Sequence, residues 1–130
     1  MVIKMERMNK EELIKLIESI GIDFDEFWIL SSSALVLRDL FESAGDLDIA
    51  VTQKGLEQLK EKYNLIHKHD NWYQVTEKIE CVLDTKVDSN IEKYGKYNLE
   101  SLEKYFEYLK TSEREKDKIR YDIVKKALNR

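Results

Sequence analysis

The chain has 130 residues, of which 42% are hydrophobic and 37% charged, and its formal net charge is −4. This is enough for one domain with a core, and the acidic balance excludes the strongly basic class of nucleic-acid binders. No apolar run approaches the roughly 18 residues of a membrane span, and the first residues lack the apolar core of a signal peptide. One cysteine cannot form an internal disulfide. We therefore predict a single-domain cytoplasmic protein without a membrane partner.

Hydrophobic periodicity and turn residues divide the chain into helices and strands without an obvious linker. The first helix is the best defined, because Asn9 and Glu12 form a capping-box pattern and Gly21 favours a helix end. In chain order the predicted elements are helix 9–21, strand 27–32, helix 34–45, strand 46–51, helix 55–63, strands 65–69, 72–76 and 78–84, a loop at 85–97, and two final helices.

The two final helices are predicted from apolar stripes. Asn98 is the expected cap of the first. In the second, Ile119, Ile123 and Ala127 are expected to face the core, joined by Val124 and Leu128. The whole pattern favours an α/β (α+β) fold, in which helices flank a short mixed β-sheet. We place the α/β core at residues 1–96 and the C-terminal helical pair at residues 97–130.

Two aspartates stand in the apolar run that ends in the second strand. Residues two apart in a strand share a face, so Asp46 and Asp48 are expected to project together while Leu47 and Ile49 pack on the other side. Two neighbouring carboxylates repel each other unless a proton or cation intervenes. Oxygen ligands suit Mg²⁺ or Mn²⁺. The alternative is an exposed strand start in which neither aspartate has a ligand.

Three serines precede the second predicted helix. Ser31, Ser32 and Ser33 fall at its N-terminus, where backbone N–H groups favour a phosphate. The sequence therefore predicts a phosphate site and a metal site on adjoining segments.

The segment SSSALVLRDLFESAGDLDIAV, residues 31–51, resembles the signature of the nucleotidyltransferase superfamily. Polymerase-β-like members of this superfamily carry a Gly-Ser turn, a helix, and Asp-hydrophobic-Asp on a strand. Here Ser32-Ser33 stands at the turn, twelve residues intervene, and Asp46-Leu47-Asp48 follows. The resemblance implies the minimal nucleotidyltransferase fold, Mg²⁺ or Mn²⁺ at the two aspartates, and the β- and γ-phosphates of an NTP at the serines. The chain departs from the family by having serine in place of glycine.

The resemblance also implies a third carboxylate on a later strand and basic residues near the C-terminus. Glu80 is the candidate carboxylate for catalysis and metal binding, with Asp84 in reserve; a solvent-facing Glu80 is the alternative. Lys110 and Arg114 match the closing helix of small bacterial nucleotidyltransferase-like proteins, where they would bind the leaving pyrophosphate. A solvated helix face is the alternative for both.

Two functions follow from the resemblance. The first is a metal-dependent nucleotidyltransferase that moves a nucleoside monophosphate from an NTP to a hydroxyl of an unidentified acceptor, with nucleic acid a partner only as acceptor. The superfamily includes antibiotic-modifying enzymes, RNA-modifying enzymes and toxins of toxin–antitoxin pairs. The second is a catalytically silent module of the same fold that binds a protein partner, as a phage or mobile-element protein would.

Other residues with chemical potential have plainer interpretations. His67 and His69 share a strand face without an evident third metal ligand, so we expect hairpin surface. Cys81 alternates with Glu80 and is expected to be a small buried hydrophobe. Trp72 and Tyr73 have the rings to stack on a base, but packing in the core or at its rim is the expectation.

Overall fold

The computed structural model describes residues 7–84 and 91–129. These residues form elements in the order α1 (Lys10–Ser19), η1 (Phe24–Glu26), β1 (Phe27–Ile29), α2 (Ser31–Leu37), β2 (Leu47–Val51), α3 (Gln53–Lys62), β3 (Ile66–His69), β4 (Trp72–Gln74), β5 (Ile79–Leu83), β6 (Ile91–Tyr94), β7 (Tyr97–Glu100), α4 (Leu102–Thr111) and α5 (Glu115–Ala127). No helix within these two ranges is long and apolar enough to cross a membrane.

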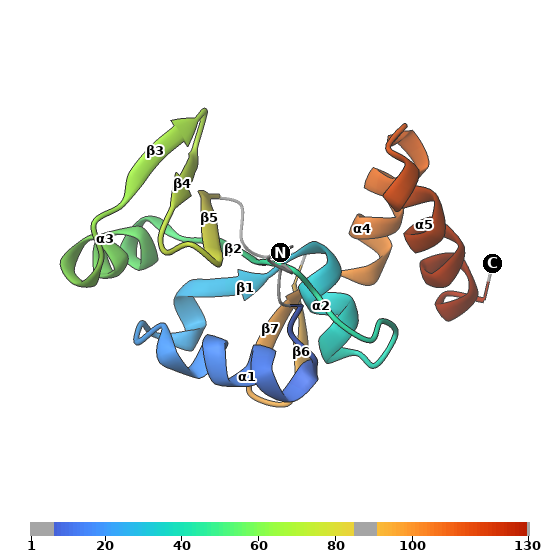
Figure 1. The fold of residues 1–130 in the computed structure, drawn as a ribbon, viewed down its shortest axis with the longest axis horizontal. Helices are drawn as coiled ribbons and strands as arrows, with labels where there is room; N and C mark the ends of the chain where they lie inside the picture. The colour runs from blue at the N-terminus through green and yellow to red at the C-terminus, as the bar shows by residue number, and fades with distance from the viewer. Residues whose placement is uncertain (1–6, 85–90, 130) are drawn as a thin grey trace, which may run out of the picture.

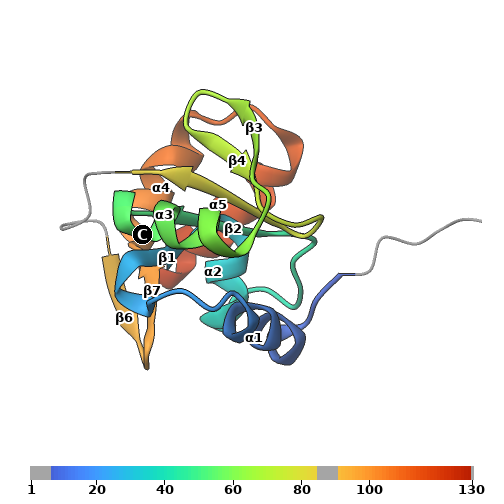
Figure 2. The ribbon, with the colours of Figure 1, turned by 90° about the vertical axis from the view of Figure 1, so that its left-hand side faces the viewer.

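One mixed sheet joins the seven strands of the described residues in the order β3-β4-β5-β2-β1-β7-β6. β2 pairs with β5 and β1 pairs with β7 in parallel, and the other neighbours are antiparallel. The β3–β4 hairpin and the α4–α5 pair rise on opposite sides of β1 and β2 (Figure 1). Figure 2 views the same arrangement from the α3 side, with α4 and α5 behind the sheet. The predicted α+β class with a mixed sheet and flanking helices is confirmed.

The first helix forms as its sequence predicts. The Asn9 side chain accepts a hydrogen bond from the Glu12 backbone N–H at 2.9 Å, and the Glu12 side chain accepts one from the Asn9 backbone N–H at 3.0 Å. Gly21 adopts a φ of +80°, which favours glycine at the helix end. Leu13 and Ile17 are fully buried. The capping box thus fixes where α1 begins, and the apolar stripe fixes which side faces the core.

The main core lies on the face of β2 that points away from its central aspartate. Leu47, Ile49 and Val51 are fully buried there among apolar residues of α1, α3 and β5. A second, smaller cluster joins the C-terminal helices to α2, and consists of Leu35, Tyr105, Phe106, Leu109 and Val124. Because the α4–α5 pair packs through this separate cluster, it stands beside the sheet and forms one wall above the strand ends.

The second helix differs from the prediction at both ends. It begins directly after β1 at Ser31 and ends at Leu37, whereas the sequence predicted residues 34–45. Asp39 adopts a left-handed backbone with φ +63°, and the Leu40 N–H donates to the Leu35 carbonyl at 2.9 Å. This is the Schellman arrangement that ends helices. The hydrophobic periodicity does not show where this helix ends, because Leu40 still packs against the apolar cluster after the last helical residue.

A hairpin replaces the second half of the predicted loop. Residues 85–90 of that loop lie outside the described residues, but β6 and β7 pair through residues 91–100 and turn at Gly95, with φ +65°. Asn98 is therefore a buried strand residue, and its side chain donates to the Phe24 carbonyl at 2.9 Å. The Ser101 side chain caps α4 instead, so the helical pair begins at Leu102.

The last helix buries only part of the face predicted for it: Val124 is fully buried and Leu128 packs against the same cluster, as expected. Ile119 is 63% exposed and Ala127 is exposed, whereas Val124 and the carboxylate residue Asp117 are buried. Asp117 accepts hydrogen bonds from Arg114, Arg120 and the Ser112 hydroxyl. An apolar-stripe argument could not find the buried position of Asp117, because it places carboxylates on the solvent side, and this one is buried with its ion-pair partners.

Candidate active site

The parallel pairing of β2 with β5 brings two of the predicted carboxylates together. In this register Asp48 lies opposite Glu80, and residues opposite one another on neighbouring strands share a face. Both are partly buried, while Leu47 and Ile49 pack into the core on the other face. The predicted alternation along β2 therefore holds, and it leaves Asp48 and Glu80 side by side above the sheet.

Asp46 belongs to the same acidic group without being part of the strand. It is exposed and precedes β2 by one residue, and its backbone carbonyl accepts a hydrogen bond from the Ser33 hydroxyl at 2.8 Å. Burial, and then the negative charges of Glu80 and Asp46, raise the pKa of Asp48 to about 6. An acidic cluster with this effect favours a bound proton or cation.

Two lysines oppose this accumulation of negative charge. The ammonium of Lys68, from the edge strand β3, lies 3.0 Å from Glu80 Oε2. Lys68 and Lys116 both act to lower the pKa of Asp48, against the larger contributions of burial and the neighbouring carboxylates. Lys68 was not identified from the sequence, because its contact depends on how β3, β4 and β5 are ordered in the sheet.

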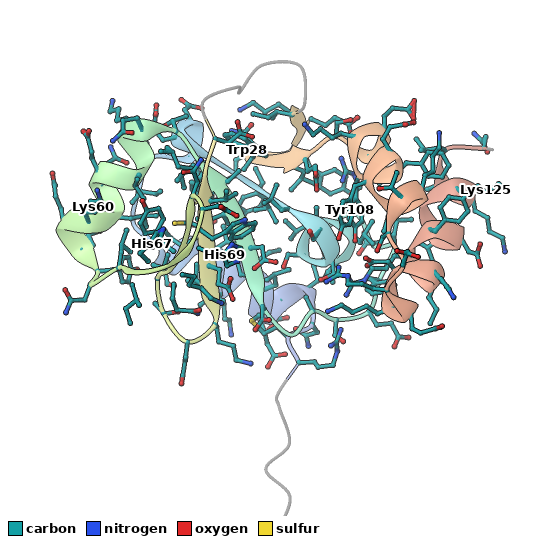
Figure 3. The ribbon with its side chains drawn as sticks, turned by 90° about the horizontal axis from the view of Figure 1, so that it is seen from above. Trp28, Lys60, His67, His69, Tyr108 and Lys125 are labelled. Atoms are coloured by element: carbon teal, nitrogen blue, oxygen red, sulfur yellow. The ribbon has the colours of Figure 1, made fainter. Side chains whose placement is uncertain are left out.

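A cavity of about 380 Å³ opens beside Asp48. This is the size range of small-molecule sites. The β4 side contributes an indole ring and the helical side contributes two tyrosines and two basic side chains; its lining residues are Leu30, Ser31, Asp48, Trp72, Glu100, Lys104, Tyr105, Tyr108 and Arg114. In the view from above, Tyr108 lies between α4 and the strands, on the side of α4 that faces the cavity (Figure 3). The cavity therefore combines a carboxylate, cations and aromatic rings.

The three serines have separate positions. Ser31 lines the cavity in a left-handed conformation with φ +53°, and its backbone N–H donates to Glu100 Oε1 at 3.1 Å. Ser33 is buried and its hydroxyl bonds the Asp46 carbonyl, whereas Ser32 is partly exposed. Ser31 thus has the backbone conformation that glycine adopts most readily. A carboxylate of the protein itself, Glu100, occupies its N–H.

Glu100 is an acidic residue of the cavity that the sequence did not indicate. Its burial raises its pKa, and the opposing effects of the Ser31 N–H, Lys104 and Arg38 do not cancel this. It ends β7, a strand whose residues were expected to begin the C-terminal helical pair. The missing strand explains why Glu100 and its neighbour Lys104 were not identified.

The two basic residues predicted in the C-terminal region lie at different places in the structure. Arg114 lines the cavity, and its guanidinium is held by Asp117 through Nε–Oδ2 and Nη2–Oδ1 contacts of 2.8 and 3.2 Å. Lys110 pairs with Glu107 at 3.3 Å and lines a separate hollow between α4 and α5. Arg114 is therefore adjacent to the candidate site, and Lys110 is not among the residues around the cavity.

The remaining candidates lie away from the cavity. Asp84 follows β5, and its N–H donates to the Val51 carbonyl. His67 and His69 are exposed on β3, where both contact Asp70. Cys81 is fully buried, which confirms its prediction, and burial followed by the charge of Glu80 raises its pKa to about 12.

The carboxylate pair has the donor type for Mg²⁺ or Mn²⁺ but few ligands. Within residues 7–84 and 91–129, no three or more His, Cys, Asp or Glu side chains are grouped to hold a metal ion by themselves. Mg²⁺ usually binds one or two carboxylates together with waters and substrate phosphates. Asp48 and Glu80 fit that mode, in which a nucleotide completes the coordination.

No family model, curated protein or solved structure matches the chain. The family resemblance therefore rests on the residues of the chain and stays a prediction.

Proposed function

We propose that the protein is a metal-dependent nucleotidyltransferase that transfers a nucleoside monophosphate from an NTP to a hydroxyl group of an acceptor. The observation that supports this most is the register of β2 and β5. It sets Glu80 beside Asp48, and Asp48 lines a 380 Å³ cavity whose other walls carry Lys104, Arg114 and Trp72. Carboxylates, phosphate-binding cations and an aromatic ring are the groups that a metal–nucleotide complex requires.

In this proposal Asp48 and Glu80 hold the metal ion. A bound Mg²⁺ or Mn²⁺ would neutralise phosphate charge and favour the deprotonated acceptor hydroxyl. The hydroxyl oxygen attacks the α-phosphorus, the bond to the bridging oxygen breaks, and pyrophosphate leaves. Lys104 and Arg114 would bind phosphate oxygens during this step, and Glu80 would take up the hydroxyl proton. Asp117 keeps the Arg114 guanidinium in one orientation through its two contacts.

A second function has its own supporting observation. The Glu100 carboxylate accepts the Ser31 N–H, and the Ser33 hydroxyl bonds the Asp46 carbonyl, so two groups expected to bind phosphate already have partners. A catalytically silent module that binds a protein partner through the same fold would not need the Ser31 N–H and the Ser33 hydroxyl to be free for phosphate. Fold alone does not decide between an enzyme and a binding module.

Calorimetric titration separates the two functions. ATP, GTP, CTP and UTP are titrated into the wild-type protein with Mg²⁺, Mn²⁺ or EDTA, and into the Asp48→Asn and Glu80→Gln variants. Glu61→Gln on the exposed side of α3 is the matched control. The enzyme proposal expects metal-dependent binding of at least one nucleotide that both site variants lose and the control keeps. Folded wild-type protein that binds none of the four would refute it and favour the silent module.

A further inference from the structure

An ammonium group already occupies part of the candidate metal site. Lys68 stands on β3, the edge strand of the sheet, and β4 separates it from β5, which carries Glu80. Its side chain nevertheless crosses β4 and places Nζ 3.0 Å from Glu80 Oε2. The order of the strands therefore brings Lys68 within reach of Glu80 across β4, and the contact sets a positive charge beside the acidic pair.

The charges around this contact explain why the lysine lies there. Glu80 is opposite Asp48 in the sheet, and Asp46 is near enough to act on Asp48. Lys68 is the ion-pair partner of Glu80 within the described residues. Without a metal ion, an ammonium group is the available counter-charge for partly buried carboxylates that would otherwise repel each other.

We propose that Lys68 is the internal counter-ion of the Asp48–Glu80 pair and that a divalent cation binds by displacing its ammonium from Glu80. This inference rests on the proposed function. An ammonium group in contact with Glu80 repels a divalent cation that binds the same carboxylate, and it occupies one of the oxygens that the cation would use. Lys68 can leave readily, because its side chain is 38% exposed at the sheet edge and its stem is flexible. The cost is that metal ions bind more weakly than they would to the bare pair.

Removing the ammonium group should strengthen metal binding. The test is a calorimetric titration of Mn²⁺, without nucleotide, into wild-type protein and into Lys68→Met, which keeps the length and apolar stem of the side chain. We expect about tenfold tighter binding in Lys68→Met, because an ion pair no longer has to be broken and a repulsive charge is gone. Lys68→Arg keeps the charge and should bind Mn²⁺ like the wild type.

The matched control is Lys60→Met, which makes the same change in net charge. Lys60 extends from α3 at the outer end of the molecule, away from the cavity (Figure 3), and should leave Mn²⁺ affinity unchanged. Melting curves establish that each variant is folded before the titration. A structural role of Lys68 alone would change stability and leave the ranking of metal affinities untouched.

The outcomes separate this inference from the proposed function. Equal Mn²⁺ affinity in wild type and Lys68→Met, lost in Asp48→Asn, would overturn the counter-ion role while retaining the metal site. No Mn²⁺ binding by any variant, combined with no metal-dependent nucleotide binding, would overturn the proposed function and the inference together. Tighter binding in Lys68→Met with unchanged Lys60→Met would support the inference.

Discussion

Replacing Asp48 by asparagine should stabilise the protein at neutral and alkaline pH. The carboxyl has an ordinary pKa of 3.8, and in the folded protein burial, followed by the charges of Glu80 and Asp46, raises the pKa to about 6. A group that binds its proton more tightly when folded stabilises the fold at low pH. That stability is present below pH 4 and is lost as the pH rises through 6. Asparagine is uncharged throughout, so it avoids the loss.

The magnitude follows from the shift of the pKa. A change of roughly two pKa units corresponds to about 3 kcal/mol in the free energy of unfolding above pH 7. For a domain of this size, that free energy corresponds to an increase in Tm of about 10 °C. At pH 4 and below, the difference between Asp48→Asn and wild type should shrink toward zero. A stabilising substitution in a partly buried polar position is the mark of a site kept for function.

The assay is urea denaturation of both proteins at several values between pH 4 and pH 8, in EDTA so that metal ions do not contribute. Other titrating groups, including Glu100, are common to both proteins and largely cancel in the difference. Glu61→Gln serves as control and should show no pH-dependent difference from wild type. Equal pH dependence for wild type and Asp48→Asn, or a variant that is less stable at pH 8, would refute the reasoning.

Three further predictions concern Asp117, Gly55 and Cys81. Asp117→Ala should lower the free energy of unfolding by about 3 kcal/mol in urea denaturation, because it leaves cationic partners of a buried carboxylate uncompensated. Burial acts to raise the pKa of Asp117, but the hydrogen bonds that the carboxylate accepts outweigh the effect of burial and lower the pKa. The stability that Asp117 contributes should therefore be lost only as the pH falls below 3.8. Gly55→Ala should destabilise by more than about 1 kcal/mol despite the better helix propensity of alanine, because the new Cβ would lie 2.6 Å from the Glu26 carbonyl oxygen. Gly45→Ala is its matched control, since the nearest atom would be 3.5 Å away and thermal melting should change little. Cys81 should react with a thiol reagent only at the rate of unfolding, because it is fully buried and its pKa is raised to about 12; rapid reaction in native buffer would contradict this.

Local sequence features predicted the elements whose causes are local. The capping box of Asn9 and Glu12 fixed α1, and the alternation of Leu47, Asp48 and Ile49 fixed which face of β2 carries a carboxylate. Both arise from residues a few positions apart, so one sequence suffices to find them. The same alternation in β5 separated Glu80 from buried Cys81.

Features that depend on distant segments could not be predicted. β6 carries exposed, charged residues that look like loop, and the β6–β7 hairpin joins the sheet because β7 pairs with β1, some 70 residues earlier. Glu100 and Lys104 join the cavity only through that pairing. Lys68 meets Glu80 only because the sheet order places β3 two strands from β5. Strand order is set by packing across the whole domain, so it cannot be predicted from the periodicity of residues within one strand.

The central claim is that a metal–nucleotide complex binds at the Asp48–Glu80 pair. Line broadening by Mn²⁺ tests it directly, because the paramagnetic ion broadens the backbone amide signals of nearby residues in ¹⁵N-labelled protein. With an NTP present, we predict broadening centred on Asp48 and Glu80 that extends to Ser31 and Lys104. Broadening centred instead on the exposed turn of His67, His69 and Asp70, or none with all four nucleotides, would contradict the claim.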